Sequence, residues 1–311
     1  GNGNRVDSLV FKPTAYDYEK VVMLNQYDCE YGDGDIITNQ TATVGNGVNI
    51  VFMGDCFDAK DIAEGYYKEI MDEAICYFFA VEPYTTYKDY FNVYTVIGHS
   101  PDSGLPTTYA INQESKSGSQ YAYGNDGFQF KFNDTECFEY ACKVPSITTD
   151  NLNQTLIVLI ENSNVYGGVT RMWGDNSAIA VCSIMRGNYP NDFRGVVQHE
   201  AGGHGFGKLA DEYIYNGNFI DMCGCGEGHV KEFLQGQNNG WYQNLSLKSN
   251  IYEVPWSHMI FDPQFSNSVD MYEGGYFHQR GVFRSEPNSC MNNNIPYFSA
   301  SVTQTSRYSL F

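Results

Sequence analysis

The chain has 311 residues, of which 18 are Lys or Arg and 37 are Asp or Glu, so its formal net charge is −19. Apolar residues make up 42% of it, enough to build one large domain or two small ones, which excludes global disorder. The negative charge opposes binding to nucleic-acid phosphates and anionic membrane surfaces. The longest aliphatic run, residues 156–160, is far shorter than the ~20 apolar residues of a membrane helix, so we expect no membrane insertion.

The first half of the chain predicts peripheral segments followed by an organised core. Residues 1–46 lack strong periodicity and are expected to form a leading arm or peripheral strands. Residues 48–53 are an apolar run that predicts a buried strand. Asp58 can cap the next helix, in which apolar side chains recur at i, i+4 from Ile62 to Phe78.

Later segments continue this alternation of strands and helices. Residues 91–97, 155–160 and 177–184 predict strands, and residues 193–208 predict a helix. From Ala210 onward the chain is dense in Gly, Asn, Tyr and Ser, which indicates a loop-rich C-terminal subdomain. The pattern predicts an α/β fold with a sheet covered by helices, in which residues 47–311 form one domain.

One stretch, residues 199–213, carries two of the six histidines and reads HEAGGHGFGKLADEY. In the HExxH motif of zinc peptidases, two histidines four residues apart share a helix face, so both can bind one ion. The Glu between them acts on the metal-bound water as a general base. His199 and His204 are five apart, which places them about 140° apart on a regular α-helix. We therefore expect a π-bulge or broken turn at Gly202 and Gly203.

The acidic pair that follows offers a third ligand. The glycine-rich turn after His204 can bring Asp211 or Glu212 back to the same ion. Ordinary buried histidines and a solvated acidic corner are the structural alternative. Two histidines, an adjacent Glu200, flanking glycines and a carboxylate pair within fourteen residues favour a metal site instead.

This segment resembles the active-site segment of the immunoglobulin A peptidase family of zinc metallopeptidases, with one residue inserted between the histidines. Residues 49–55, 90–94, 281–284 and 289–291 resemble further segments of the family in the same order. The resemblance implies a metzincin-like zincin fold with a twisted, mostly parallel sheet. It also implies a methionine turn beneath the metal at Met291, which is a packing role.

On this basis, neutral His199 and His204 with Asp211 are expected to hold Zn²⁺, and Glu200 to act as general base in the hydrolysis of peptide bonds. Metzincins usually place the third ligand six residues after the second His, where this chain has Ala210. We prefer Asp211 because its side chain is shorter, and Glu212 could instead hydrogen-bond a ligating histidine. Weaker candidates for binding an oxyanion or a substrate carboxylate are Tyr213, Tyr276, His278, Arg280 and Arg284.

The function predicted is a zinc-dependent endopeptidase acting on extracellular proteins or glycoproteins. The alternative is an inactive zincin-fold module that binds protein or glycan, its catalytic geometry lost through the inserted residue. The sequence does not fix the oligomeric state.

Nine cysteines favour an exported protein, secreted, periplasmic or at the cell surface. The pairs Cys137/Cys142 and Cys223/Cys225 are candidate local disulfides. For the second pair, a loop disulfide is favoured over a metal site with His229, because the spacing is not typical of zinc sites. The chain starts at Gly1 without a signal-like stretch, so we expect either a shortened chain or a mature form whose targeting segment has been removed.

Overall fold

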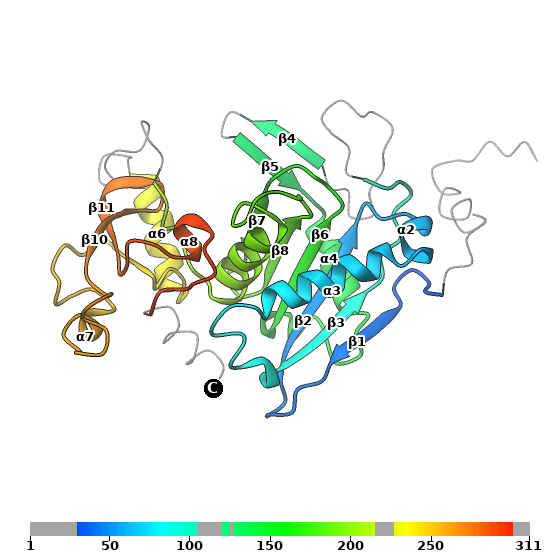
Figure 1. Ribbon diagram of the computed structural model, residues 1–311, viewed down its shortest axis with the longest axis horizontal. Helices are drawn as coiled ribbons and strands as arrows, with labels where there is room; N and C mark the ends of the chain where they lie inside the picture. Colours follow the sequence, from blue (N-terminus) through cyan, green and yellow to red (C-terminus); the bar gives the residue numbers. More distant parts are fainter. Residues whose placement is uncertain (1–29, 105–119, 125–126, 215–226, 301–311) are drawn as a thin grey trace, which may run out of the picture.

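A computed structural model describes residues 30–104, 120–124, 127–214 and 227–300. A six-stranded sheet in the order β1-β3-β2-β6-β8-β7 forms its centre (Figure 1). Its four inner strands are parallel, and an antiparallel strand closes each edge. The strands are β1 (Ile36–Gln40), β2 (Val48–Asp55), β3 (Phe91–Val96), β6 (Thr155–Glu161), β7 (Gly168–Met172) and β8 (Ala178–Ser183). The expected mixed α/β fold with a mostly parallel sheet is confirmed.

Side chains alternate across this sheet and create two cores. On one face, Ile50 and Phe52 of β2 pack with α3 (Tyr66–Phe78) and α5 (Phe193–Val197). On the other face, Val51 and Met53 pack with α4 (Asp134–Ala141). Strands buried on both faces read as continuous apolar runs, which is why residues 48–53 and 155–160 predicted strands.

The expected helix after Asp58 is two helices, α2 (Ala59–Ala63) and α3. Asp58 caps α2 as expected, accepting hydrogen bonds from the backbone N–H groups of Lys60 and Asp61. Gly65 then adopts a left-handed conformation with φ of 83° and redirects the chain. The i, i+4 spacing therefore describes α3, and the extension back to Asp58 was wrong.

The expected disulfide between Cys137 and Cys142 is wrong, because both cysteines are free. Cys137 lies within α4 and Cys142 is its C-terminal cap. Five residues apart, their side chains leave the helix about 140° apart, so the sulfur atoms cannot meet. Cys223 and Cys225 lie outside the described residues.

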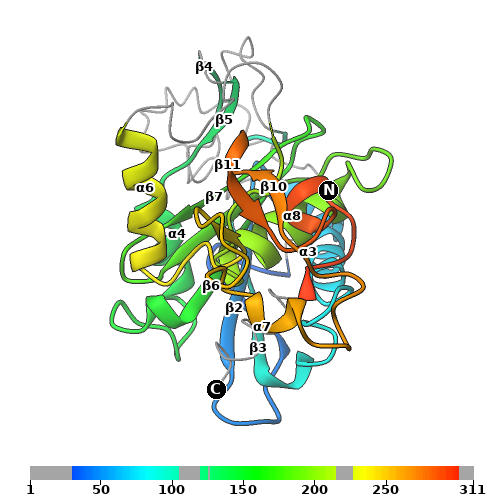
Figure 2. The same cartoon turned by 90° about the vertical axis from the view of Figure 1, so that its left-hand side faces the viewer.

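The C-terminal elements gather at one side of the large sheet (Figures 1 and 2). They comprise α6 (Glu227–Asn238), β9 (Leu245–Ser246), α7 (Ser257–Ile260), β10 (Tyr272–Gly275), β11 (His278–Arg284) and α8 (Cys290–Asn293). The three strands form a small sheet in the order β10-β11-β9. A two-stranded hairpin, β4 (Gln120–Gly124) and β5 (Gly127–Lys131), is separate from both sheets. Among the described residues, no helix has the length and apolar character needed to cross a bilayer.

Candidate metal centre

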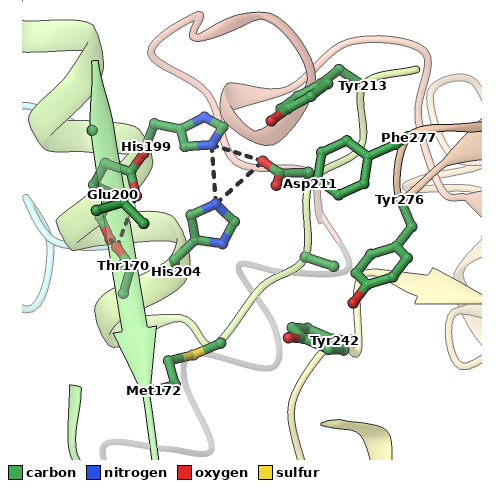
Figure 3. Close-up of a pocket in the computed structure, with 13 residues that line it drawn as sticks. Thr170, Met172, His199, Glu200, His204, Asp211, Tyr213, Tyr242, Tyr276 and Phe277 are labelled. Carbon is green, nitrogen blue, oxygen red and sulfur yellow. Dashed lines mark hydrogen bonds and ion pairs between the residues drawn. The ribbon is translucent and has the colours of Figure 1, made fainter. Parts of the chain in front are cut away.

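The segment with both histidines is a nine-residue π-helix, Gln198–Phe206, that continues α5. Asp192 caps α5 by accepting from the backbone N–H of Gly195. In the π-helix the hydrogen bonds span five residues, as between the Gly207 N–H and the Gly202 carbonyl oxygen. His199 and His204 have the same five-residue separation that these hydrogen bonds span, and both rings project from the same side (Figure 3). The deformation expected at the glycine pair is thus confirmed.

Glycines allow this helix to lie close to its neighbours. A Cβ atom on Gly203 would be 2.1 Å from Met291 Sδ, and one on Gly205 would be 2.7 Å from Leu156 Cδ1. Met291 is fully buried in α8, beneath the π-helix. The packing role expected for Met291 is therefore what the structure shows.

Three side-chain atoms converge on one point (Figure 3). His199 Nε2 lies 3.2 Å from His204 Nε2 and 3.0 Å from Asp211 Oδ1, and His204 Nε2 lies 3.2 Å from the same oxygen. Nitrogen and carboxylate oxygen at such separations are a donor set that could hold a metal ion.

The hydrogen bonds of the two Nδ1 atoms determine the tautomer of each imidazole. His199 Nδ1 is 3.0 Å from the Cys290 carbonyl oxygen, and His204 Nδ1 is 2.7 Å from that of Leu209. A carbonyl oxygen only accepts hydrogen bonds, so Nδ1 of each ring must donate. In neutral rings both Nε2 atoms then carry lone pairs that point towards Asp211. A cation at their meeting point would satisfy all three groups.

Charge coupling shifts the ionisation of these groups in the metal-free protein. Burial alone lowers the pKa of His204, but the Asp211 carboxylate outweighs burial and raises this pKa to about 9. The pKa of His199 is raised in the same way against the effect of burial. Burial acts to raise the pKa of Asp211, yet the two imidazoles hold it well below its usual range. Asp211 therefore carries its charge next to the histidines.

Glu200 lies beside this trio, against the edge strand β7. Its Oε2 accepts a hydrogen bond of 2.8 Å from Thr170 Oγ1, which fixes the carboxylate. A Cβ atom on Gly168 would lie 2.5 Å from Glu200 Cγ, so only glycine leaves room for this side chain. The carboxylate thus has a defined position next to His199.

A cavity of about 280 Å³ opens in front of these groups. Glu200 and Thr170 stand on one side of the histidines, and four aromatic rings stand on the other (Figure 3). These rings belong to Tyr213, Tyr242, Tyr276 and Phe277. The cavity therefore combines polar groups with an aromatic wall, a composition suited to binding an organic substrate.

Glu212, the other candidate ligand, has different neighbours. Its carboxylate accepts hydrogen bonds from Asn244 Nδ2 at 2.9 Å and from Ser289 Oγ at 2.6 Å. Burial raises its pKa to about 7. The idea that Glu212 hydrogen-bonds a ligating histidine was wrong, since backbone carbonyl oxygens take that place.

The weaker candidates separate into two groups. Tyr213 and Tyr276 line the cavity, whereas Arg280 is exposed and Arg284 donates to the Gly274 carbonyl oxygen. His278 contacts another histidine instead of the cavity.

Sequence reasoning missed Gly168, Thr170, Tyr242 and Phe277, which also line the cavity. Gly167-Gly168 ahead of the β-branched pair Val169-Thr170 was the available signal for a strand at the site. Another buried group, Asp55, Cys56 and Glu161, has metal-ligand atoms close together. There, Asp55 Oδ1 accepts hydrogen bonds from the Cys56 N–H and the Ser100 hydroxyl.

Comparison with known proteins supports a peptidase. The model of the IgA peptidase M64 family matches residues 36–221, which contain the π-helix, Asp211 and the edge strand β7. No curated protein matches the chain. Since the match covers more than half of the 311 residues, the chain belongs to the IgA peptidase M64 family.

Proposed function

We propose that this protein is a zinc-dependent endopeptidase in which His199, His204 and Asp211 hold the ion. The observation that carries the proposal is the convergence of two imidazole nitrogens and a carboxylate oxygen within 3.2 Å of one another. Two histidines and a carboxylate form a common ligand set of catalytic zinc, which keeps one position open. A bound zinc ion supplies Lewis acidity, polarising a carbonyl group and lowering the pKa of water.

We propose Glu200 as the general base. The Thr170 hydroxyl group donates a hydrogen bond to Glu200 Oε2 and so keeps the carboxylate beside the histidines. From there the carboxylate can take a proton from water and deliver it to the leaving amine. Tyr213, whose ring centroid is 6.4 Å from that of His199, is our candidate donor to the substrate oxyanion.

The shape of the site supports a peptide substrate. β7 is the outer strand of the six-stranded sheet, and four of its five residues line the cavity. An outer strand offers backbone groups to which an extended peptide can pair. We further propose a metzincin-like zincin fold, supported by Met291 packed beneath the histidines.

The experiment that tests this function compares Glu200→Gln with the native protein on an unfolded protein substrate. We expect zinc to be retained and the rate to fall by a factor of about 10² to 10⁴, because the general base is removed. Glu64→Gln, a change of an exposed Glu in the same fold, is the matched control and should keep full activity. A fully active Glu200→Gln protein would overturn the proposal.

We also propose that the enzyme acts outside the cytoplasm on extracellular proteins. The support is the composition, with 37 acidic residues, 25 tyrosines and only 18 Lys plus Arg. Fractionation of the source cells with an antibody against the chain tests this point, and a cytoplasmic signal alone would contradict it.

A further inference from the structure

A second pair of histidines lies in the C-terminal elements. His229 belongs to α6 and His278 begins β11, and His229 Nδ1 is 2.9 Å from His278 Nε2. The ring centroids are 5.0 Å apart with the planes tilted by 54°. The corresponding values for His199 and His204 are 4.9 Å and 71°. At both places two imidazoles therefore meet through ring nitrogens, Nε2 with Nε2 in the first pair and Nδ1 with Nε2 in the second.

The surroundings of this pair are buried and aromatic. His278 has no exposed surface, and the Tyr276 ring packs 5.1 Å from His229 and 5.1 Å from Phe233. Just before His278, Tyr276 and Phe277 both have positive φ, 47° and 70°. Two consecutive non-glycine residues in this conformation are strained, so the surrounding structure must hold them. The strained turn directs His278 back towards α6.

We propose that His229 and His278 bind a second divalent transition-metal ion, for which zinc is the best match. Imidazole nitrogen is a preferred ligand of zinc. Such an ion would join a helix to a hairpin that are 49 residues apart in sequence, so its binding energy would stabilise this part of the fold. The remaining positions fall to water or to other donors. Cys223 and Cys225 precede His229 by six and four residues in the sequence, but they lie outside the described residues and the proposal does not depend on them.

This second site has a direct connection to the catalytic cavity. The Tyr276 N–H donates to the Asp211 carbonyl oxygen at 2.9 Å, and the Phe277 N–H donates to that of Tyr213 at 3.0 Å. The side chains of Tyr276 and Phe277 form part of the aromatic wall (Figure 3). An ion at His278 therefore fixes the turn that carries this wall and contacts the segment holding Asp211.

Zinc counting in a protein that lacks only the first site tests the proposal. The variant His199→Ala/His204→Ala leaves His229 and His278 unchanged, so the proposed ligands of the second ion remain in place. We expect about two zinc ions per native chain and about one in this variant. One zinc in the native chain and none in the variant would show that His229 and His278 form only a hydrogen bond, and would leave the peptidase proposal intact.

Removal of the second site is the complementary measurement. His229→Gln should lose one zinc and raise KM for a peptide substrate severalfold at nearly unchanged kcat, because the aromatic wall is loosened while Glu200 is not. His258→Ala, a histidine of α7 in the same region, is the matched control and should keep both ions. A folded His229→Gln protein that still binds two zinc ions would overturn the assignment.

Discussion

The two histidine pairs of this chain have similar geometry but different origins. His199 and His204 lie five residues apart on one π-helix, whereas His229 and His278 come from a helix and a hairpin 49 residues apart. The first pair has Asp211 within 3.2 Å, and aromatic rings border the second. Local chain geometry thus builds the first site, and tertiary packing builds the second.

The difference shows in what each site can do. Beside the first pair, Glu200 and a cavity give room for a substrate and a base. Beside the second pair, the Tyr276 ring and the buried His278 indicate a structural role, in which α6 and β11 are held together. We therefore expect changes that move Glu200 beside the first pair to affect kcat, and changes near the second pair to affect KM.

Among changes that leave Glu200 itself in place, the largest effect is expected for Gly168→Ala. The new methyl group would overlap Glu200 Cγ and displace its carboxylate, which should lower kcat by about 10²-fold, or about 2.7 kcal/mol, while zinc is retained. Gly174→Ala is the matched control, since no atom lies within 4 Å of its added methyl group. Steady-state kinetics and zinc analysis measure both, and unchanged kcat in Gly168→Ala would disprove the position assigned to Glu200.

Gly203→Ala tests whether the first pair depends on local packing of the π-helix. Its methyl group would overlap Met291 Sδ, and the buried Met291 has little room to move. We expect the free energy of unfolding to fall by about 2 kcal/mol, measured by urea denaturation. Combined with Met291→Ala, the loss should be smaller than the sum of the single losses. Strict additivity would mean that the contact does not shape the helix.

The carboxylate of the first site predicts a pH dependence of zinc binding. In the metal-free protein the pKa of His204 is about 9, so the ring is protonated at neutral pH, and zinc must displace this proton. Apparent zinc affinity should rise at least about tenfold per pH unit, about 1.4 kcal/mol, up to pH 9, since the pKa of His199 is raised as well. In Asp211→Asn the negative charge that raises the pKa of His204 is lost, so the increase in zinc affinity with pH should end at a lower pH. Competition titration with a chelator measures this, and identical profiles would contradict the coupling.

A smaller effect is expected for Thr170→Val, which removes the hydroxyl group that holds Glu200. Loss of this hydrogen bond should lower kcat about fivefold, or about 1 kcal/mol, with KM little changed. Thr170→Ser keeps the hydroxyl group and should restore most of the rate. If valine and serine behave alike, Thr170 does not position the carboxylate.

The sequence predicted those parts of the fold that depend on local patterns. The inner strands were apparent as apolar runs, and the deformation at Gly202 and Gly203 followed from the five-residue spacing. Asp211 was preferred over Glu212 only by side-chain length. The hydrogen bonds that hold Glu212 to Asn244 and Ser289 are tertiary contacts, which no local pattern reveals.

Other contacts of the site could not be predicted from the sequence, because they too are tertiary contacts. The contact of β7 with Glu200 joins segments about 30 residues apart, and no local pattern encodes it. The contact between His229 and His278 is more distant still. The break between α2 and α3 at Gly65 was also missed. The apolar periodicity continues through this glycine, although its left-handed conformation ends one helix and starts another.

The most direct test of the central claim is an anomalous difference map at the zinc edge from crystals of the zinc-loaded protein. If these three residues hold the ion, a peak is expected about 2.0–2.2 Å from His199 Nε2, His204 Nε2 and an Asp211 oxygen, with the π-helix intact. A peak that lacks His204, or one bound by Glu212 in place of Asp211, would contradict it.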